Sequence, residues 1–196
     1  MKIGLYFGSF NPIHVAHLII ANHILNETDI ERIWFIISPQ NPFKAESNLL
    51  NEYHRLHLVR LATEEDNRIK SSDIEFGLPK PSYTINTLIY LQEKFSEHEF
   101  AIIMGSDSFQ NFHRWKNYET IIKNYSIYVY IRPGFEIRNH LNTNLNIIDA
   151  PLLQLSATQI RKYIKEGKSI RYMVPAKVLE EIEKGGYYKK SSEKIS

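Results

Sequence analysis

Residues 8–17 read GSFNPIHVAH, and this stretch decides the fold because it joins an apolar run, Ile3–Phe7, to an amphipathic one. The pattern predicts a strand, a tight turn and a helix. Glycine permits the dihedral angles of a sharp turn, and proline suits the first turn of a helix. His14 and His17, three residues apart, then share one helix face. Helix N–H groups attract an anion and imidazoles donate to it, so the stretch predicts a phosphate site.

A zinc site is the first alternative for the two histidines. Zinc needs three or four protein ligands, and cysteine is absent from the chain. Without cysteine, the two histidines supply at most half of a zinc ligand set, so the sequence predicts no metal site. Two ordinary surface histidines are the second alternative, and the preceding strand and Gly-Ser-Phe-Asn-Pro turn argue against it.

The composition is that of a soluble globular protein. The 196 residues are 43% hydrophobic and 23% charged, enough for one domain, 1–196, with one good core. No apolar run is long enough to cross a bilayer, and the N-terminal strand is too short for a secretory signal. The absence of cysteine fits a reducing compartment, so we expect a cytoplasmic protein with no membrane partner. A net charge of +2 is too small for a nucleic-acid binder, and nothing indicates an oligomeric state.

Short apolar runs alternate with stretches of helical period, which is typical of βα units on a parallel sheet. The predicted strands are Ile3–Phe7, Ile33–Ile37, an edge strand Ile69–Phe76, Phe100–Met104, Ile127–Ile131 and Asn146–Ile148. The predicted helices are His14–Leu25, Glu52–Glu65, Thr84–Phe95, a short one ending over Ile121–Asn124, Ala157–Glu166 and Pro175–Lys184. The fold class is therefore α/β, a doubly wound, Rossmann-like parallel sheet with a small C-terminal helical part, 151–186, and a frayed tail, 187–196.

Several common catalytic patterns are absent. The chain has no GxxxxGK[ST], no GxGxxG and no G-x-S-x-G around Ser9. The histidine turn is therefore interpreted as a device for holding phosphates and not for covalent chemistry.

A second anion site is predicted at Ser156–Arg161. Ser156 and Gln159 form a capping box, and this structural role accounts for both. The capping box leaves Thr158 and Arg161 without a structural role. They lie within one turn of the positive end of a helix, where the Arg161 guanidinium can bind two phosphate oxygens at once. Two anion sites in one chain indicate a polyphosphate ligand.

Three further residues each have two interpretations. Asp107 follows a predicted strand, where it either accepts from ribose hydroxyls or caps a helix. Trp115 either stacks on a planar ring or packs its face on the protein. Lys44, in a loop with two prolines, is a phosphate clamp or, as the sequence favours, a solvated charge.

Five blocks together resemble the bacterial nicotinate mononucleotide adenylyltransferases, in chain order from Lys2 to Ile182. They are Gly8–His17, Pro42–Lys44, Pro81–Leu88, Gly105-x-Asp107 with Trp115, and Ser156–Arg161. The histidine turn alone is common to a larger nucleotidyltransferase superfamily, and the Ser82-Tyr83-Thr84 block narrows the resemblance. Two positions depart from the family pattern: Ala157 replaces a common serine, and Asn86 a common acid.

The resemblance implies a nucleotidyltransferase fold and the reaction of ATP with nicotinate mononucleotide to give nicotinate adenine dinucleotide and pyrophosphate, in NAD biosynthesis. It implies Mg²⁺, held mainly by the ATP phosphates because no dense carboxylate cluster is present. The implied catalytic residues are His14, His17, Lys44 and Arg161. The implied ATP-binding residues are Gly8, Ser9, Phe10, His14, His17, Gly105, Ser156, Thr158 and Arg161. The implied residues for the second substrate are Asn11, Lys44, Ser82, Tyr83, Thr84, Asp107 and Trp115.

Other functions stay open from the residues alone. The same chemistry could act on nicotinamide mononucleotide or phosphopantetheine. A protein that senses a nucleotide without turning it over is a third possibility, although two histidines, Lys44 and Arg161 are more than binding requires.

Overall fold

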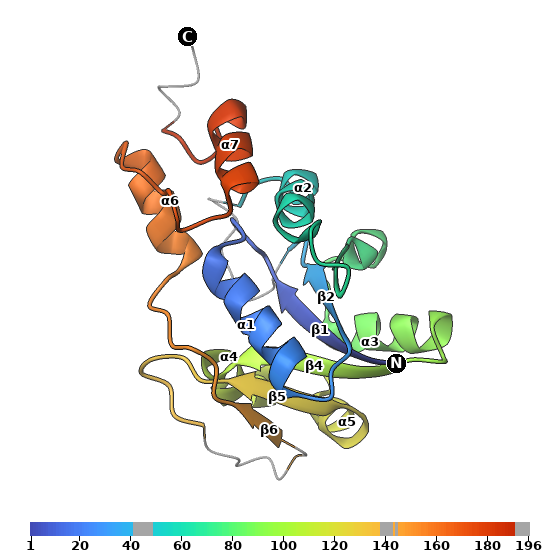
Figure 1. Cartoon of the computed structure of the whole chain (residues 1–196). Helices are drawn as coiled ribbons and strands as arrows, with labels where there is room; N and C mark the ends of the chain where they lie inside the picture. The colour runs from blue at the N-terminus through green and yellow to red at the C-terminus, as the bar shows by residue number, and fades with distance from the viewer. Residues whose placement is uncertain (41–48, 138–142, 144, 191–196) are drawn as a thin grey trace.

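The fold comes from a computed structural model that describes residues 1–40, 49–137, 143 and 145–190. One parallel sheet crosses the molecule, with helices on both of its faces (Figure 1). Its strands are β1 (Lys2–Gly8), β2 (Arg32–Ile37), β3 (Ile69–Ser72), β4 (Glu99–Gly105), β5 (Ser126–Tyr130) and β6 (Leu145–Ile148). Their order is β3-β2-β1-β4-β5-β6, and every neighbouring pair is parallel. The predicted doubly wound α/β fold is confirmed.

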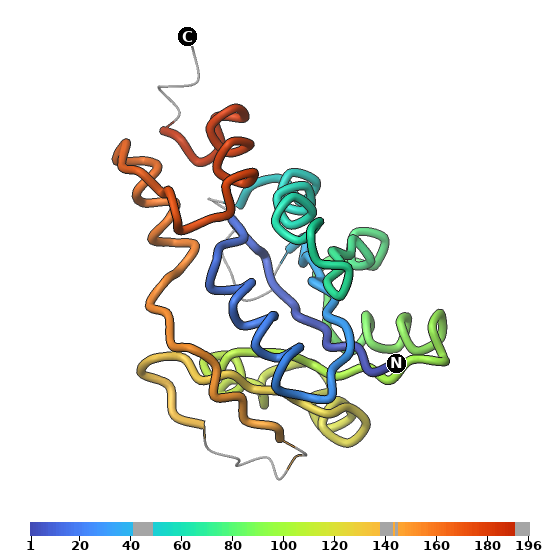
Figure 2. Tube along the Cα trace, viewed as in Figure 1, coloured from blue at the N-terminus to red at the C-terminus, as the bar shows by residue number. Residues whose placement is uncertain are grey.

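The helices are α1 (Val15–Glu27), α2 (Glu52–Thr63), α3 (Thr84–Lys94), α4 (Ser106–Gln110), α5 (Tyr118–Asn124), α6 (Ala157–Lys165) and α7 (Ala176–Gly185). Two 3₁₀ turns, η1 (Ile74–Gly77) and η2 (Phe112–Arg114), complete the described elements. Figure 2 follows the same trace and shows the C-terminal segment returning past the N-terminal half of the chain.

Successive side chains along each strand point to opposite faces of the sheet, so they pack into two separate cores. Tyr6, Phe35 and Ile103 pack under α1, α2, α6 and α7, in one buried cluster. Leu5, Ile36 and their neighbours on β4 and β5 pack under α3, α4 and α5. Because both faces of the sheet are covered, the central strands are apolar on both sides, and polar residues gather at the ends of the strands.

The topology fixes where those polar residues gather. Strand order reverses at β1, which pairs with β2 on one side and with β4 on the other. Connections leave β1 and β4 toward opposite faces, so a crevice opens beyond Gly8 and Gly105 at the ends of these two strands.

Four sequence predictions need correction. Strand β3 lies at the sheet edge as expected but ends at Ser72, because residues 74–77 turn into η1. Helix α1 begins at Val15, one residue later than predicted, because His14 is its N-cap. Helix α4 and turn η2 were not predicted. Tyr187 and Tyr188, expected in a frayed tail, pack against the core beside α2 and α7.

Candidate active site

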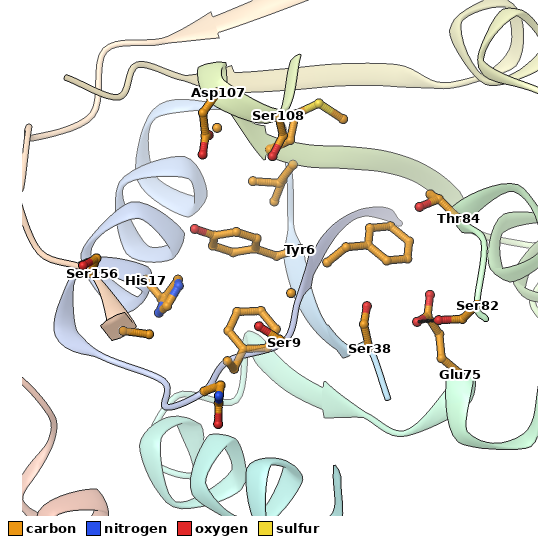
Figure 3. Close-up of a pocket in the computed structure, with 18 of the residues that line it drawn as sticks. Tyr6, Ser9, His17, Ser38, Glu75, Ser82, Thr84, Asp107, Ser108 and Ser156 are labelled. Atoms are coloured by element: carbon orange, nitrogen blue, oxygen red, sulfur yellow. Dashed lines mark hydrogen bonds between the residues drawn. The ribbon is translucent and has the colours of Figure 1, made fainter. Parts of the chain in front are cut away.

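A cavity of about 550 Å³ lies at the reversal of strand order, along the carboxyl ends of β1 and β4. Every predicted site residue that the structure describes lines it: Gly8, Ser9, Phe10, Asn11, His14, His17, Ser82, Tyr83, Thr84, Gly105, Asp107, Trp115, Ser156, Thr158 and Arg161. Lys44 lies outside the described residues. Figure 3 shows His17 and Ser156 at one end of the cavity and Ser82 and Thr84 at the other. We call these the histidine end and the α3 end.

The turn after β1 takes its shape from Phe10. This residue has a φ of 44°, in the left-handed region, and its ring is buried against Tyr6 and His17. The left-handed angle was expected at a glycine, but Gly8 has an ordinary extended backbone within β1. Glycine is needed at position 8 for another reason, because a Cβ there would lie 2.8 Å from the Phe10 ring.

The two histidines are held against each other. His14 is the N-cap of α1 and His17 lies in its first turn, so their rings stack with centroids 3.7 Å apart. The backbone N–H of His14 donates to Nδ1 of His17 at 3.3 Å. A neutral His17 ring must then carry its proton on Nε2. Burial, aided by the positive charge of Arg132, lowers the pKa of His14 from 6.5 to about 4, so its ring is neutral at pH 7.

The backbone contributes less to this anion site than the sequence predicted. The N–H of Val15 donates to the carbonyl of Met173 at 3.0 Å, and the N–H of His17 donates to the carbonyl of His14 at 3.0 Å. These first-turn donors already have partners within the chain. Recognition of an anion at the histidine end therefore falls mainly to side chains.

Arg161 reaches the histidine turn from the far end of the chain. Its Nη1 donates to the carbonyl of Asn11 at 2.7 Å, and its Nη2 lies 3.3 Å from the hydroxyl of Thr158. Ser156 caps α6 by accepting from the N–H of Gln159 at 3.2 Å, as the sequence predicted. The guanidinium and both imidazoles thus border one cavity.

A buried arginine that the sequence analysis did not single out holds this end together. Arg55 on α2 has no exposed surface. Its guanidinium donates to the carbonyls of Ser9, Ser38, Pro39 and Leu50 at 2.6 to 3.0 Å. Backbone carbonyls from three segments therefore satisfy one buried cation, as a buried charge requires.

The α3 end is built from an aromatic wall and the start of a helix. Tyr83 is the N-cap of α3, with no hydrogen bond from its side chain, and Lys116 lies 4.6 Å above its ring. Trp115 is half-buried and packs on Phe112 with ring centroids 4.8 Å apart, which confirms its packing on the protein, and it also lines the cavity.

Asp107 lies at the end of β4, between the two ends of the cavity. It is in the first turn of α4 but is not the N-cap, which is Gly105. Its Oδ2 pairs with Nη1 of Arg132 at 3.1 Å. A Cβ on Gly105 would lie 2.5 Å from the other carboxylate oxygen, so glycine permits this approach. The capping interpretation of Asp107 is wrong, and a carboxylate facing the cavity remains.

Known proteins similar to this chain show the family to which it belongs. Residues 5–163 match the model of the cytidylyltransferase-like family. The chain is 50% identical over 195 residues to a probable nicotinate-nucleotide adenylyltransferase of Flavobacterium johnsoniae, covering 97% of this chain and 100% of that one. It is 44% identical over 183 residues to the protein of the same name from Bacteroides thetaiotaomicron, covering 93% and 91%. The chain belongs to the nicotinate-nucleotide adenylyltransferase family.

Solved structures share the fold of this chain at low identity. The nicotinic acid mononucleotide adenylyltransferase of Plasmodium falciparum, complexed with NaAD, superposes with a TM-score of 0.81 at 22% identity, over 95% of this chain and 97% of that one. The same protein complexed with APC gives 0.80 at 21% identity, over 95% and 96%.

Three charged side chains that line the cavity were missed from the sequence: Arg132, Lys116 and Glu75. Arg132 follows the end of β5, so the rule that drew attention to Asp107 after β4 could have found it. Glu75 was hidden because residues 69–76 were predicted as one strand. Lys116 gave no signal beyond its place next to Trp115.

The described part of the chain contains no group of three or more His, Cys, Asp or Glu side chains able to hold a metal ion. In the same residues, no helix is long and apolar enough to cross a membrane.

Proposed function

We propose that this chain transfers the adenylyl group of ATP to nicotinate mononucleotide, giving nicotinate adenine dinucleotide and pyrophosphate in NAD biosynthesis. One observation carries the proposal: a single cavity joins imidazole and guanidinium groups at one end to an aromatic wall and a helix start at the other. The names of relatives at up to 50% identity agree with it.

The reaction needs alignment more than covalent chemistry. A phosphate oxygen of the mononucleotide attacks the α-phosphorus of ATP, a new P–O bond forms, and the bond to the β-phosphate oxygen breaks as pyrophosphate leaves. No proton has to be removed from the attacking phosphate oxygen. The protein contributes by placing two anions in line and by stabilising the negative charge that moves onto pyrophosphate.

The histidine end is proposed to hold the triphosphate. His17 carries its proton on Nε2 when neutral and can donate it to a phosphate oxygen. Arg161 adds a charged donor, and Ser156 and Thr158 add hydroxyls beside it. Lys44, outside the described residues, is proposed to bind the phosphates on the resemblance alone.

The α3 end is proposed to hold the pyridine mononucleotide. Trp115 offers a flat face for the ring, and the N–H groups around Tyr83 and Thr84 suit a carboxylate at the start of α3. Asp107, between the two ends, is placed for ribose hydroxyls.

Mg²⁺ is proposed to arrive with ATP, since this small hard ion keeps most of its water and binds phosphate oxygens readily. Bound there, it would neutralise part of the triphosphate charge. The cytoplasm is proposed as the location, because a cysteine-free chain suits a reducing compartment.

Pyrophosphate release from ATP, Mg²⁺ and each acceptor in turn tests the proposal. We expect turnover with nicotinate mononucleotide and a lower kcat/KM with nicotinamide mononucleotide. If phosphopantetheine were the one acceptor that supported turnover, the proposed acceptor would be wrong and phosphopantetheine would replace it. Nucleotide binding by calorimetry without any pyrophosphate release would favour a sensor and overturn the enzyme.

A further inference from the structure

A buried carboxylate lies behind the α3 end of the cavity. Glu75, in η1, is only 2% exposed, although most glutamates in proteins are on the surface. Among the described residues no ion pair joins Glu75, and its hydrogen-bond donors are hydroxyls. Burial raises the pKa of Glu75, and hydrogen bonds from Ser82, Thr87 and Ser38 partly offset the rise. Burying an acid without a counter-ion costs free energy unless hydrogen bonds to its oxygens compensate.

Both oxygens of Glu75 accept hydroxyl hydrogen bonds from the α3 segment. The hydroxyl of Ser82 donates to Oε2 at 2.7 Å, and the hydroxyl of Thr87 donates to Oε1 at 2.8 Å. Both donors are buried, and they flank the start of α3 at Thr84. Figure 3 shows Glu75 and Ser82 close together at this end of the cavity. One side chain therefore fixes the chain on both sides of Tyr83 and Thr84.

A carboxylate suits this role better than a neutral side chain. It is an acceptor only, with room for several donors, and hydrogen bonds to a charged acceptor are stronger than those to a neutral one. Within the described part of the chain, the N-cap Tyr83 makes no capping hydrogen bond, so the start of α3 relies on Ser82 and Thr87 for side-chain support.

Direct contact with the substrate does not explain Glu75. Its two oxygens are turned to hydroxyls of the protein. A negative charge would also repel the phosphate and the ring carboxylate of the mononucleotide at close range.

We propose that Glu75 is a positioning residue for the pyridine mononucleotide, holding Ser82–Thr87 so that the backbone at the start of α3 faces the ring. The proposal rests on the proposed function. It adds that affinity for one substrate depends on a carboxylate that never touches it.

The test is the steady-state kinetics of Glu75→Gln, which keeps the shape and removes the charge. Loss of a charge-assisted hydrogen bond is expected to raise KM for nicotinate mononucleotide about tenfold. KM for ATP is expected to stay within twofold of wild type. Glu93→Gln, at an exposed glutamate of α3, is the matched control and should change neither constant.

A double-mutant cycle separates positioning from general damage. Thr87→Val removes one donor, and if the hydroxyl acts through Glu75, the double variant should lose clearly less than the product of the two single effects. Equal increases in KM for both substrates, a fall in kcat alone, or an unchanged KM for the mononucleotide would each overturn the proposal. Absence of turnover in the wild-type protein would instead overturn the proposed function.

Discussion

Each end of the cavity is held by one buried charged side chain. The two charges have opposite signs, and they differ in which parts of the chain they bond to. At the histidine end, the Arg55 guanidinium bonds to backbone carbonyls at positions 9, 38, 39 and 50. At the α3 end, the Glu75 carboxylate accepts from the hydroxyls of Ser82 and Thr87, 7 and 12 residues further along the chain, and from Ser38 after β2. The first charge joins three segments through their backbone carbonyls, and the second bonds mainly to side chains around the start of α3. A substitution of Arg55 should therefore destabilise the whole protein, whereas a substitution of Glu75 should change the affinity for one substrate.

Arg55→Met gives the largest expected effect on stability. It leaves four carbonyls without their donor, so the free energy of unfolding should fall by on the order of 4 kcal/mol. Urea denaturation measures this loss. Arg60→Met, at an exposed position on the same helix, should stay within about 0.5 kcal/mol of wild type. Similar losses in the two variants would contradict the assigned role of Arg55.

His17→Ala tests the histidine end by its effect on turnover. Removal of one preorganised donor to the phosphates should lower kcat by about 10²- to 10³-fold, or roughly 3–4 kcal/mol of barrier. KM for the pyridine mononucleotide should change little, because that substrate binds at the other end. Pyrophosphate release gives both constants, with the exposed His57→Ala as control. A variant of His17 with normal kcat would remove this residue from the proposed mechanism.

His14 should make stability depend on pH. Its pKa is lowered from 6.5 to about 4 in the folded protein, so between these values the unfolded chain binds more protons. Stability is therefore fully present above pH 6.5 and falls as the pH drops toward 4, by about 3 kcal/mol from this group.

Denaturant titrations of wild type and His14→Phe from pH 7 to pH 4 isolate the contribution of His14. The raised pKa of Glu75 acts in the opposite direction, but it is common to both proteins and cancels in the difference. Parallel curves for the two proteins would show that His14 is not buried in its neutral form.

Trp115→Ala should affect the α3 end alone. Loss of a stacking face costs about 1–2 kcal/mol, so KM for nicotinate mononucleotide should rise roughly tenfold while KM for ATP is unchanged. Tyr90→Ala, a partly exposed aromatic residue on α3, is the control. Equal changes in the two KM values would mean that the two ends of the cavity do not bind separate substrates.

Lys116→Met gives the smallest expected effect. The ammonium group lies 4.6 Å above the Tyr83 ring, and at a partly exposed site such a contact contributes about 0.5–1 kcal/mol. KM for the mononucleotide should rise by roughly two- to fivefold, and the exposed Lys123→Met should leave it unchanged. A larger effect than that of Trp115→Ala would indicate that Lys116 itself contacts the substrate.

Much of the cavity could be predicted because its residues follow simple local rules. A strand followed by a glycine-containing turn and a helix brought attention to His14 and His17. The ends of parallel strands meet at one edge, so the sequence alone was enough to place Asp107 near them. The same rule applied to β5 would have added Arg132.

The predictions were wrong where the local backbone conformation depends on contacts with distant parts of the chain. The sequence predicted free N–H groups at the start of α1, but Met173, far along the chain, supplies a carbonyl to Val15. It also predicted a strand through residue 76, because nothing local marks the point where η1 turns Glu75 into the core.

The sequence by itself determined the α/β class, the order of the strands and longer helices, and many of the polar residues that face the cavity, because hydrophobic period and turn chemistry act over a few residues. Only the tertiary structure decided which buried charges hold the two ends. Arg55 bonds to carbonyls, which every residue carries, so no side-chain pattern reveals its partners. Glu75 is fixed by burial, and burial depends on how the whole chain packs around it.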